Sequence, residues 1–390
     1  VMRKRTIVLL QCSTALGAMG YGVMFTVLDN FRDEYGISEA NLGILVGVGF
    51  FTSFFAQILI APFADKGKAK QMIMIGMSLE IVGNLLMAFG HNFEVLFIAR
   101  LLMGFGGGIT YPAVRRVIIL ADKDNMGSNL GRLVSADVGG FALGPLLSAI
   151  TADLFGIAAP FLIISVLVSI VIIGLWNLHV TEADIGTAPT QKLAFDLLRI
   201  KPIAGAITIG LSLYLMIGAF DSVWSLMMAD LDAAPWVANV GITLFALPMV
   251  VLGPRGGRLT HKIGPFRASI GGLSLGALCM VAYGLLGSPY VMLGVGIFHG
   301  IIDGLTITGG SAAIALVAPK DRLASAQGLM GGMQTLMGGF AAITAGATYD
   351  AFGRTPTYLF TALLMLLLIA TGSWLARASL HINGLAETSE

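Results

Sequence analysis

The chain has 390 residues, of which 56% are hydrophobic and only 12% are charged. This balance is typical of a protein embedded in a bilayer and excludes a disordered chain or a small disulfide scaffold. The two cysteines, Cys12 and Cys279, lie in apolar runs, so we expect no metal site and no cofactor. The net charge of +1 provides no field that would attract nucleic acid, and we expect no nucleic-acid partner.

Twelve apolar runs have about the 20 residues that a helix needs to cross the roughly 30 Å hydrocarbon layer. The sequence therefore predicts an all-α polytopic membrane protein with 12 transmembrane helices. The first run follows Arg3, Lys4 and Arg5, and we interpret it as a membrane helix because it is too long for the core of a signal peptide. The predicted spans are residues 6–30, 41–63, 71–90, 94–117, 128–151, 158–179, 203–228, 235–257, 266–286, 289–317, 324–347 and 355–377.

The positive charges alternate between the loops that these spans define. Twenty of the 23 Lys and Arg residues fall at the two ends of the chain and in every second loop, whereas the opposite loops hold only Arg32 and Arg354. Because cytoplasmic loops carry the excess of Lys and Arg, both termini are expected in the cytoplasm. Arg100 remains within a span.

The longest polar segment divides the twelve spans six and six. We therefore expect an N-terminal six-helix half over residues 1–180, a cytoplasmic linker over 181–202 and a C-terminal six-helix half over 203–390.

The two halves also repeat one another at a shift of 196 or 197 residues. Gly104 and Gly108 fall on Gly300 and Gly304, and the loop 61–70 falls on the segment from Gly257 to Phe266. Parallel six-helix repeats are a common construction of secondary transporters, with the substrate site between the halves. The glycines alone also fit close packing of membrane helices. The repeat thus predicts two pseudo-symmetric halves.

The loop between the second and third spans carries the residues Ala61-Pro62-Phe63-Ala64-Asp65-Lys66-Gly67-Lys68-Ala69-Lys70. It is similar to the G-x-L-A-D-R-x-G-R-K signature of the major facilitator superfamily, with matches at Asp65, Lys66 and Lys70. The resemblance implies a gating role for these three residues, in which the loop packs against the other half. An acid beside a helix N-terminus suits that role. The alternative is a solvated basic loop that only fixes orientation.

Two further segments resemble motifs of the same superfamily. Arg100-Leu101-Leu102-Met103-Gly104 is similar to the R-x-x-Q-G core of its fourth helix, and Gly140-Phe141-Ala142-Leu143-Gly144-Pro145 resembles the G-x-x-x-G-P motif of its drug:proton antiporter branch. The resemblance covers essentially the whole chain and implies the 12-helix fold and a gating role for Gly140, Gly144 and Pro145. A Gly-Pro pair in a helix is otherwise only a kink and a packing surface.

Ionisable residues inside the spans are candidates for proton coupling, because a charge at the bilayer centre costs about 2.5 to 3.5 kcal/mol. Asp303 has His299 one turn away on the same helix face, and this pair is the first candidate. For Arg100 we expect an anionic partner, either Glu80 or Asp137. The alternative for each acid is a static ion pair between helices. The complete set is Asp303, His299, Asp137, Glu80, Asp221 and Arg100.

The polar amide side chains in the spans are scattered singly, which does not favour a sugar site. The 19 methionines and 22 phenylalanines instead favour a deformable apolar pocket for lipophilic or amphipathic molecules. Aromatic residues on spans one, four and seven, which line the cavity in the superfamily, are the candidates for substrate binding. These are Tyr21, Phe25, Tyr111, Tyr214, Phe220 and Trp224.

The sequence thus predicts a secondary active transporter that moves a small lipophilic molecule by alternating access, through proton-coupled efflux. An organic-anion carrier, a lipid flippase and a uniporter of the same fold are the alternatives. A membrane-embedded enzyme is not expected, because HExxH and P-loop motifs are missing from the sequence. The expected partners are a small-molecule substrate, protons and membrane lipid. We expect a monomer in the bacterial cytoplasmic (inner) membrane.

Overall fold

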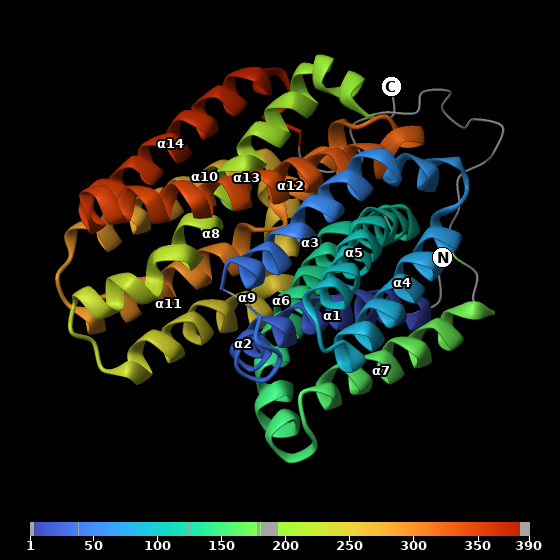
Figure 1. The fold of residues 1–390 in the computed structure, drawn as a ribbon. Helices are drawn as coiled ribbons and strands as arrows, with labels where there is room; N and C mark the ends of the chain where they lie inside the picture. Colours follow the sequence, from blue (N-terminus) through green and yellow to red (C-terminus); the bar gives the residue numbers. More distant parts are fainter. Residues whose placement is uncertain (1–3, 38, 123–124, 178–179, 181–193, 383–390) are drawn as a thin grey trace. The chain divides into compact units, whose positions relative to one another are not determined.

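The computed structural model describes residues 4–37, 39–122, 125–177, 180 and 194–382, and within these ranges all regular structure is helical (Figure 1). The apolar runs form helices because a backbone inside lipid must satisfy its own hydrogen bonds. The helices of the first half of the sequence are α1 (Lys4–Thr26), α2 (Leu28–Tyr35), α3 (Glu39–Leu59), η1 (Ala61–Lys66), α4 (Ala69–Phe89), α5 (Phe93–Ala121), α6 (Met126–Phe155) and α7 (Ala158–Trp176).

The helices of the second half begin at residue 195. Its helices are η3 (Phe195–Arg199), α8 (Lys201–Asp230), α9 (Pro235–Ile263), α10 (Pro265–Leu285), α11 (Pro289–Thr306), α12 (Gly309–Val317), η4 (Lys320–Arg322), α13 (Leu323–Phe352), α14 (Arg354–Leu375) and η5 (Arg377–Ser379).

Ten helical segments of the described chain are long and apolar enough to cross a membrane. The two other predicted spans, 235–257 and 324–347, coincide with α9 and α13, which are 29 and 30 residues long. α9 ends in a basic segment, and α13 carries many glycines with Gln327 and Gln334. The structure confirms the all-α polytopic class.

Two predicted spans each contain a turn between two helices, although the segment Pro289–Val317 as a whole is long and apolar enough to cross a membrane. The segment 289–317 is interrupted between α11 and α12, where the Thr306 hydroxyl bonds back to the Ile302 carbonyl and Gly309 begins the next helix. Glycine pairs favour such breaks because glycine has a low helix propensity. The segment 6–30 is likewise interrupted at Val27, between α1 and α2.

The chain forms two compact units. The first contains Val1–Asp122, Ala136–Ala194 and Lys320–Gly332, and the second contains the remainder. Each unit therefore follows one half of the sequence, except that the first turns of α6 belong to the second unit and those of α13 to the first. Most of the predicted linker, residues 181–193, lies outside the described residues.

The same helix pairs recur in both units. In the first unit α5 packs on α3 and α4, and α7 packs on α1 and α4; in the second, α11 packs on α9 and α10, and α14 on α8 and α10. The helix bounds also obey the repeat seen in the sequence. A shift of 196 residues carries Ala69–Phe89 onto Pro265–Leu285, and a shift of 197 carries Met126–Phe155 onto Leu323–Phe352.

Within the first unit, the glycines of the α6 motif let α6 approach α1 closely. A methyl group added at Gly140 would collide with the backbone of Ala15, and one added at Gly144 would collide with the carbonyl of Met19 and the amide nitrogen of Val23. Small residues permit such backbone contacts between membrane helices. The motif is therefore a packing surface for α1 as well as the site of Pro145, which lies inside α6.

We predict that Gly140→Ala destabilises the protein by about 1 to 3 kcal/mol, because the added methyl group overpacks the α1–α6 contact. The measurement is thermal unfolding of the purified protein in detergent, followed by tryptophan fluorescence. Gly47→Ala on α3 is the matched control, because a methyl group there meets no atom within 4 Å. Equal melting temperatures for the two variants would contradict the packing role.

Candidate functional site

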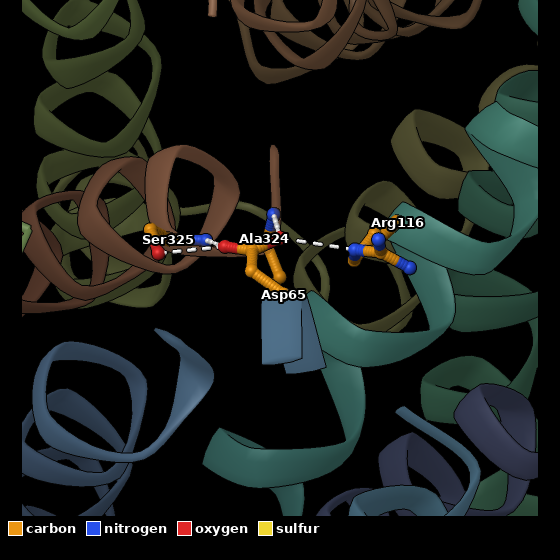
Figure 2. Close-up of polar contacts among 4 residues, drawn as sticks. All are labelled: Asp65, Arg116, Ala324 and Ser325. Carbon is orange, nitrogen blue, oxygen red and sulfur yellow. Dashed lines mark hydrogen bonds and ion pairs between the residues drawn. The ribbon is translucent and has the colours of Figure 1, made fainter. Parts of the chain in front are cut away.

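The carboxylate of Asp65 accepts four hydrogen bonds in the first unit (Figure 2). Its Oδ1 accepts hydrogen bonds from Arg116 Nε at 2.9 Å and from the backbone N–H of Ala324 at 2.8 Å. Its Oδ2 accepts from the backbone N–H and the hydroxyl of Ser325, at 2.7 and 2.6 Å. Asp65 is only 1% exposed, so these four bonds replace its hydration.

Local sequence places this carboxylate where it is needed. Pro62 starts the 3-10 turn η1, and Gly67 ends it with a left-handed φ of 74°, which glycine adopts without strain. Ala324 and Ser325 lie in the first turn of α13, where backbone N–H groups lack partners within the helix. The positive end of the helix dipole and the free N–H groups together form an anion site, which Asp65 fills.

The sequence alone did not identify Arg116 as a partner of Asp65. Arg116 follows Arg115 at the cytoplasmic end of its predicted span, and this placement is typical of charges that only fix orientation. The structure instead buries Arg116 beside Asp65, with 1% of the residue exposed. The two residues are 51 positions apart, and no local spacing rule joins them.

The lysines of the same loop have separate partners. Lys70 Nζ donates a hydrogen bond of 2.6 Å to the carbonyl oxygen of Trp176, the last residue of α7. Lys66 Nζ lies 5.5 Å from the centroid of the Phe63 ring. Asp65 thus binds the N-terminus of α13, and Lys70 binds the C-terminus of α7. Each charge is opposite in sign to the helix end that it contacts.

A second polar group in the first unit surrounds Glu80 on α4. Glu80 is 4% exposed, and its Oε2 has no hydrogen-bond partner among the described residues. Asn84, one turn later, donates to the carbonyl oxygen of Glu80 at 2.8 Å. Two glycines, Gly17 of α1 and Gly107 of α5, leave the space beside the Glu80 carboxylate.

Arg100 does not pair with Glu80 or Asp137 in the described structure, and our expectation of such an anionic partner is not met. Its guanidinium carbon lies 4.5 Å from the centroid of the Tyr21 ring, a cation–π contact. The missing side chain of Gly49 on α3 makes room for the guanidinium group. Arg100 is therefore held by an aromatic face instead of a carboxylate.

Asp137 has a different partner. The hydroxyl of Tyr111 donates a short hydrogen bond to Asp137 Oδ1, which joins α5 to α6 within the first unit. The same hydroxyl lies 3.4 Å from the carbonyl oxygen of Thr14 on α1. The structure thus brings together one predicted coupling residue and one predicted substrate-binding residue.

In the second unit, His299 and Asp303 are both sealed from solvent. His299 Nε2 lies 3.8 Å from Asp303 Oδ2 and 3.0 Å from the sulfur of Met216. Its Nδ1 is 3.3 Å from the hydroxyl of Tyr283 on α10. The predicted pair is therefore adjacent, and Asp303 Oδ2 has no hydrogen-bond partner in the described ranges. Met216 and Tyr283 were not predicted, because both resemble ordinary apolar positions of their spans.

An aromatic cluster covers this pair. The Phe220 ring lies 5.0 Å from Trp224, 5.1 Å from Phe245 and 5.3 Å from Tyr283, and Phe245 meets His299 edge-on at 5.2 Å. Phe220 and Trp224 are 2% and 0% exposed. These two predicted substrate-binding residues therefore pack against other side chains instead of lining open space, a placement that position in a span alone does not predict.

The remaining predicted residues are not part of these groups. Tyr214 is half-buried and packs beside Gly338 of α13. Asp221, on α8, has an exposed side chain. Phe25 lies in α1, and its side chain is outside the described part of the structure.

We predict that Asp65→Asn lowers the free energy of unfolding by about 3 to 5 kcal/mol, because it leaves the buried Arg116 charge without its anion. Thermal unfolding in detergent measures the change. Asp350→Asn is the matched control, since Asp350 lies exposed at the other end of α13. We expect the control to stay within about 0.5 kcal/mol of the wild type, as exposed sites usually do. Equal stability of the two variants would contradict a structural role for the Asp65 bonds.

Comparison with known proteins agrees with this architecture. The profile of the Major Facilitator Superfamily matches residues 10–220 and 206–383. The quinolone resistance protein NorA of Staphylococcus aureus (strain MSSA476) is 30% identical over 239 residues, and the aligned region spans 58% of this chain and 59% of NorA. The multidrug resistance protein MdtG of Proteus mirabilis (strain HI4320) is 25% identical over 297 residues, which are 72% of each chain.

Solved structures show the same fold at low sequence identity. The human organic anion transporter MFSD10 (TETRAN) superposes with a TM-score of 0.78 at 14% identity, covering 95% of this chain and 99% of that structure. The E. coli fucose:proton symporter FucP superposes with a TM-score of 0.75 at 16% identity, covering 95% and 98%. The chain thus belongs to the Major Facilitator Superfamily, a family of transporters and not of enzymes.

Proposed function

We propose that this chain exports small lipophilic or amphipathic molecules in exchange for protons, as a monomer surrounded by membrane lipid. The observation that carries the proposal is the buried Asp303–His299 pair of the second unit, in which Asp303 Oδ2 has no hydrogen-bond partner among the described residues. The names of NorA and MdtG, both resistance proteins, support efflux as the direction of transport.

The physical argument concerns the cost of charge. An ionised side chain in the middle of a bilayer costs about 2.5 to 3.5 kcal/mol, and a half-bonded carboxylate has little to offset this cost. Binding a proton removes the charge. When Asp303 takes up a proton from one side and releases it to the other, substrate movement can draw on the membrane potential, about 2.3 kcal/mol per charge per 100 mV.

We further propose that the Asp65 network acts as a gate. Its bonds to Ala324 and Ser325 hold the first turn of α13, while most of α13 belongs to the second unit. A gate on the cytoplasmic side has to open once in each transport cycle. Opening this gate would break the hydrogen bonds between Asp65 and the first turn of α13. Lys66 and Lys70 lie beside this gate. Lys66 contacts the Phe63 ring, and Lys70 binds the carbonyl oxygen at the end of α7.

One observation favours a second candidate, an organic-anion carrier. Arg100 is buried, and its Nε has no hydrogen-bond partner in the described ranges. A guanidinium group of this kind suits recognition of a carboxylate. The fold shared with MFSD10 is compatible with this activity but does not favour it, because identity is only 14%.

We predict that purified protein in liposomes accumulates the lipophilic cation ethidium when a pH gradient is imposed, and that Asp303→Asn abolishes this accumulation because position 303 then has no titratable group. Flux is followed by ethidium fluorescence, with fluorescein as the organic-anion probe. Glu94→Gln is the matched control, since Glu94 is an exposed acid on α5. Ethidium flux that is independent of the gradient and unchanged in Asp303→Asn would refute proton coupling, whereas fluorescein transport alone would favour the anion carrier.

The charge distribution leads us to propose the bacterial cytoplasmic membrane as the location, with both termini in the cytoplasm. A C-terminal fusion to green fluorescent protein should fluoresce in bacterial cells, and a C-terminal fusion to alkaline phosphatase should be inactive, because each reporter matures on only one side. Phosphatase inserted after Gly287, in the loop between α10 and α11, is the control and should be active. The reverse pattern would contradict the proposed orientation.

A further inference from the structure

The repeat relates two buried acids that lie on different helices. The shift of 196 residues that superposes α4 on α10 and the start of α5 on the start of α11 places Glu80 on Gly276 and Gly107 on Asp303. In the first unit the acid is on the first helix of this pair and glycine is on the second. In the second unit the arrangement is reversed. Each unit thus has one acid and one glycine at the same two repeat positions.

The geometry places each acid near the glycine of the helix that packs against its own, Glu80 directly and Asp303 through His299. A Cβ atom built on Gly107 would lie 3.8 Å from Glu80 Oε1. Gly107 is the repeat equivalent of Asp303. The Glu80 side chain therefore extends from α4 to the place on α5 that corresponds to Asp303 on α11. Conversely, a Cβ atom built on Gly276 would lie 3.1 Å from His299 Nε2, beside Asp303. We call this place the repeat carboxyl position, defined by Glu80 and Gly107 in one unit and by Asp303 and Gly276 in the other.

The two carboxylates also share their state of bonding. Both residues are nearly inaccessible, 4% exposed for Glu80 and 2% for Asp303, and each keeps one oxygen without a hydrogen-bond partner among the described residues. Neither is paired with Lys or Arg in the part of the chain that the structure describes.

The titratable groups that surround the two acids are tyrosine, cysteine and histidine side chains. Tyr111 of α5 lies near Glu80, and Gly17 of α1 lies against the Glu80 carboxylate. Around Asp303 the groups are Cys279 and Tyr283 of α10 and His299 of its own helix, while α8 presents Met216. None of these groups is a permanent cation that would hold a carboxylate charged.

The other intramembrane acids do not share this relation. A shift of 197 residues places Asp137 on Gln334, a neutral amide, and a shift of 196 places Asp221 on Phe25. Asp137 is also bonded to Tyr111, and Asp221 is exposed. Of the four intramembrane acids, Glu80 and Asp303 alone combine this relation between the repeats with burial and an oxygen that has no hydrogen-bond partner among the described residues.

We propose that Glu80 and Asp303 are equivalent proton-binding groups, one in each half, so that the transporter carries two protonatable carboxyls at the repeat carboxyl position. The proposal deepens the proton-coupled export put forward above and rests on it for its transport consequences. A protonated carboxyl donates one hydrogen bond and carries no charge, which suits a dry interface between two helices. A protonated carboxyl can therefore occupy this interface whether it is attached to the first or to the second helix of the pair.

The first test measures protonation without transport. Infrared difference spectra of the detergent-purified protein between low and high pH report the carbonyl band of protonated carboxyl groups. We expect Glu80→Gln and Asp303→Asn each to remove part of the titrating band, the double variant to remove both parts, and the exposed Glu94→Gln to remove none. An unchanged band in Glu80→Gln would overturn the proposal. This reading holds whether or not ethidium is a substrate, so it is independent of the proposed function.

The second test moves the acid to the other helix. Glu80→Gly should abolish gradient-driven ethidium accumulation in liposomes, and Glu80→Gly with Gly107→Asp should restore it, because the aspartate then copies the second repeat. Space exists for this change, since a Cβ at Gly107 meets its nearest atom at 3.7 Å. Glu80→Gly with Gly47→Asp, which adds an acid at an open position of α3, is the matched control and should remain inactive.

The two tests separate the possible failures. Restoration by Gly47→Asp as well as by Gly107→Asp would overturn the positional claim, and so would failure of Gly107→Asp in a variant whose melting temperature equals that of the wild type. If the wild type moves no ethidium but the infrared bands behave as expected, the proton-binding groups stand and the proposed export of lipophilic cations is wrong.

Discussion

The cost of burying a charge away from water explains how the ionisable residues of this transporter are arranged. A carboxylate inside the protein needs donors for its oxygens or must lose its charge. Asp65 takes the first course, with four hydrogen bonds from Arg116, Ala324 and Ser325. Glu80 and Asp303 each retain an unbonded oxygen among the described residues. A fully bonded carboxylate stabilises one arrangement, whereas a buried carboxyl with an unpartnered oxygen gains more from binding a proton.

The positions of the helices follow from hydropathy and could be predicted from the sequence. In lipid only a helix satisfies its own backbone, so apolar runs such as those of α4 and α10 fix both the number and the order of spans. Glycine patterns added the repeat, which the equal lengths of α4 and α10 bear out. The break between α11 and α12 was missed because the whole run from Pro289 to Val317 is apolar, and hydropathy does not distinguish one helix from two in line.

Side-chain partners could be predicted only where they were close in sequence. His299 and Asp303 are one turn apart on one helix, and their proximity was expected. Asp65 and Ser325 are 260 positions apart, and Arg116 at the end of a span carries the same signal as an orientation charge. Arg100 was expected to find an acid, but the Tyr21 ring offers a cation an alternative that charge counting does not include. Long-range contacts depend on how helices pack, which local patterns do not encode.

The two repeats use different side chains where a loop or helix end contacts the first turn of α13 or of α6. In the first unit the signature acid Asp65 neutralises the positive end of α13. In the second unit the repeat places His261 where the first has Asp65, and Gly127, in the first turn of α6, lies against it. A neutral or positive imidazole cannot complement a helix N-terminus as a carboxylate does.

At position 261, where the second unit has no carboxylate, α6 and α9 are in backbone contact instead. Methyl groups added at Gly127 and Gly131 would collide with the carbonyl oxygens of Gly257 and Gly253 on α9. Such glycine contacts require no charge, and they separate without leaving a buried carboxylate unbonded. The polar contact at Asp65 in the first unit thus has an apolar counterpart in the second, where glycines of α6 and α9 meet at the backbone.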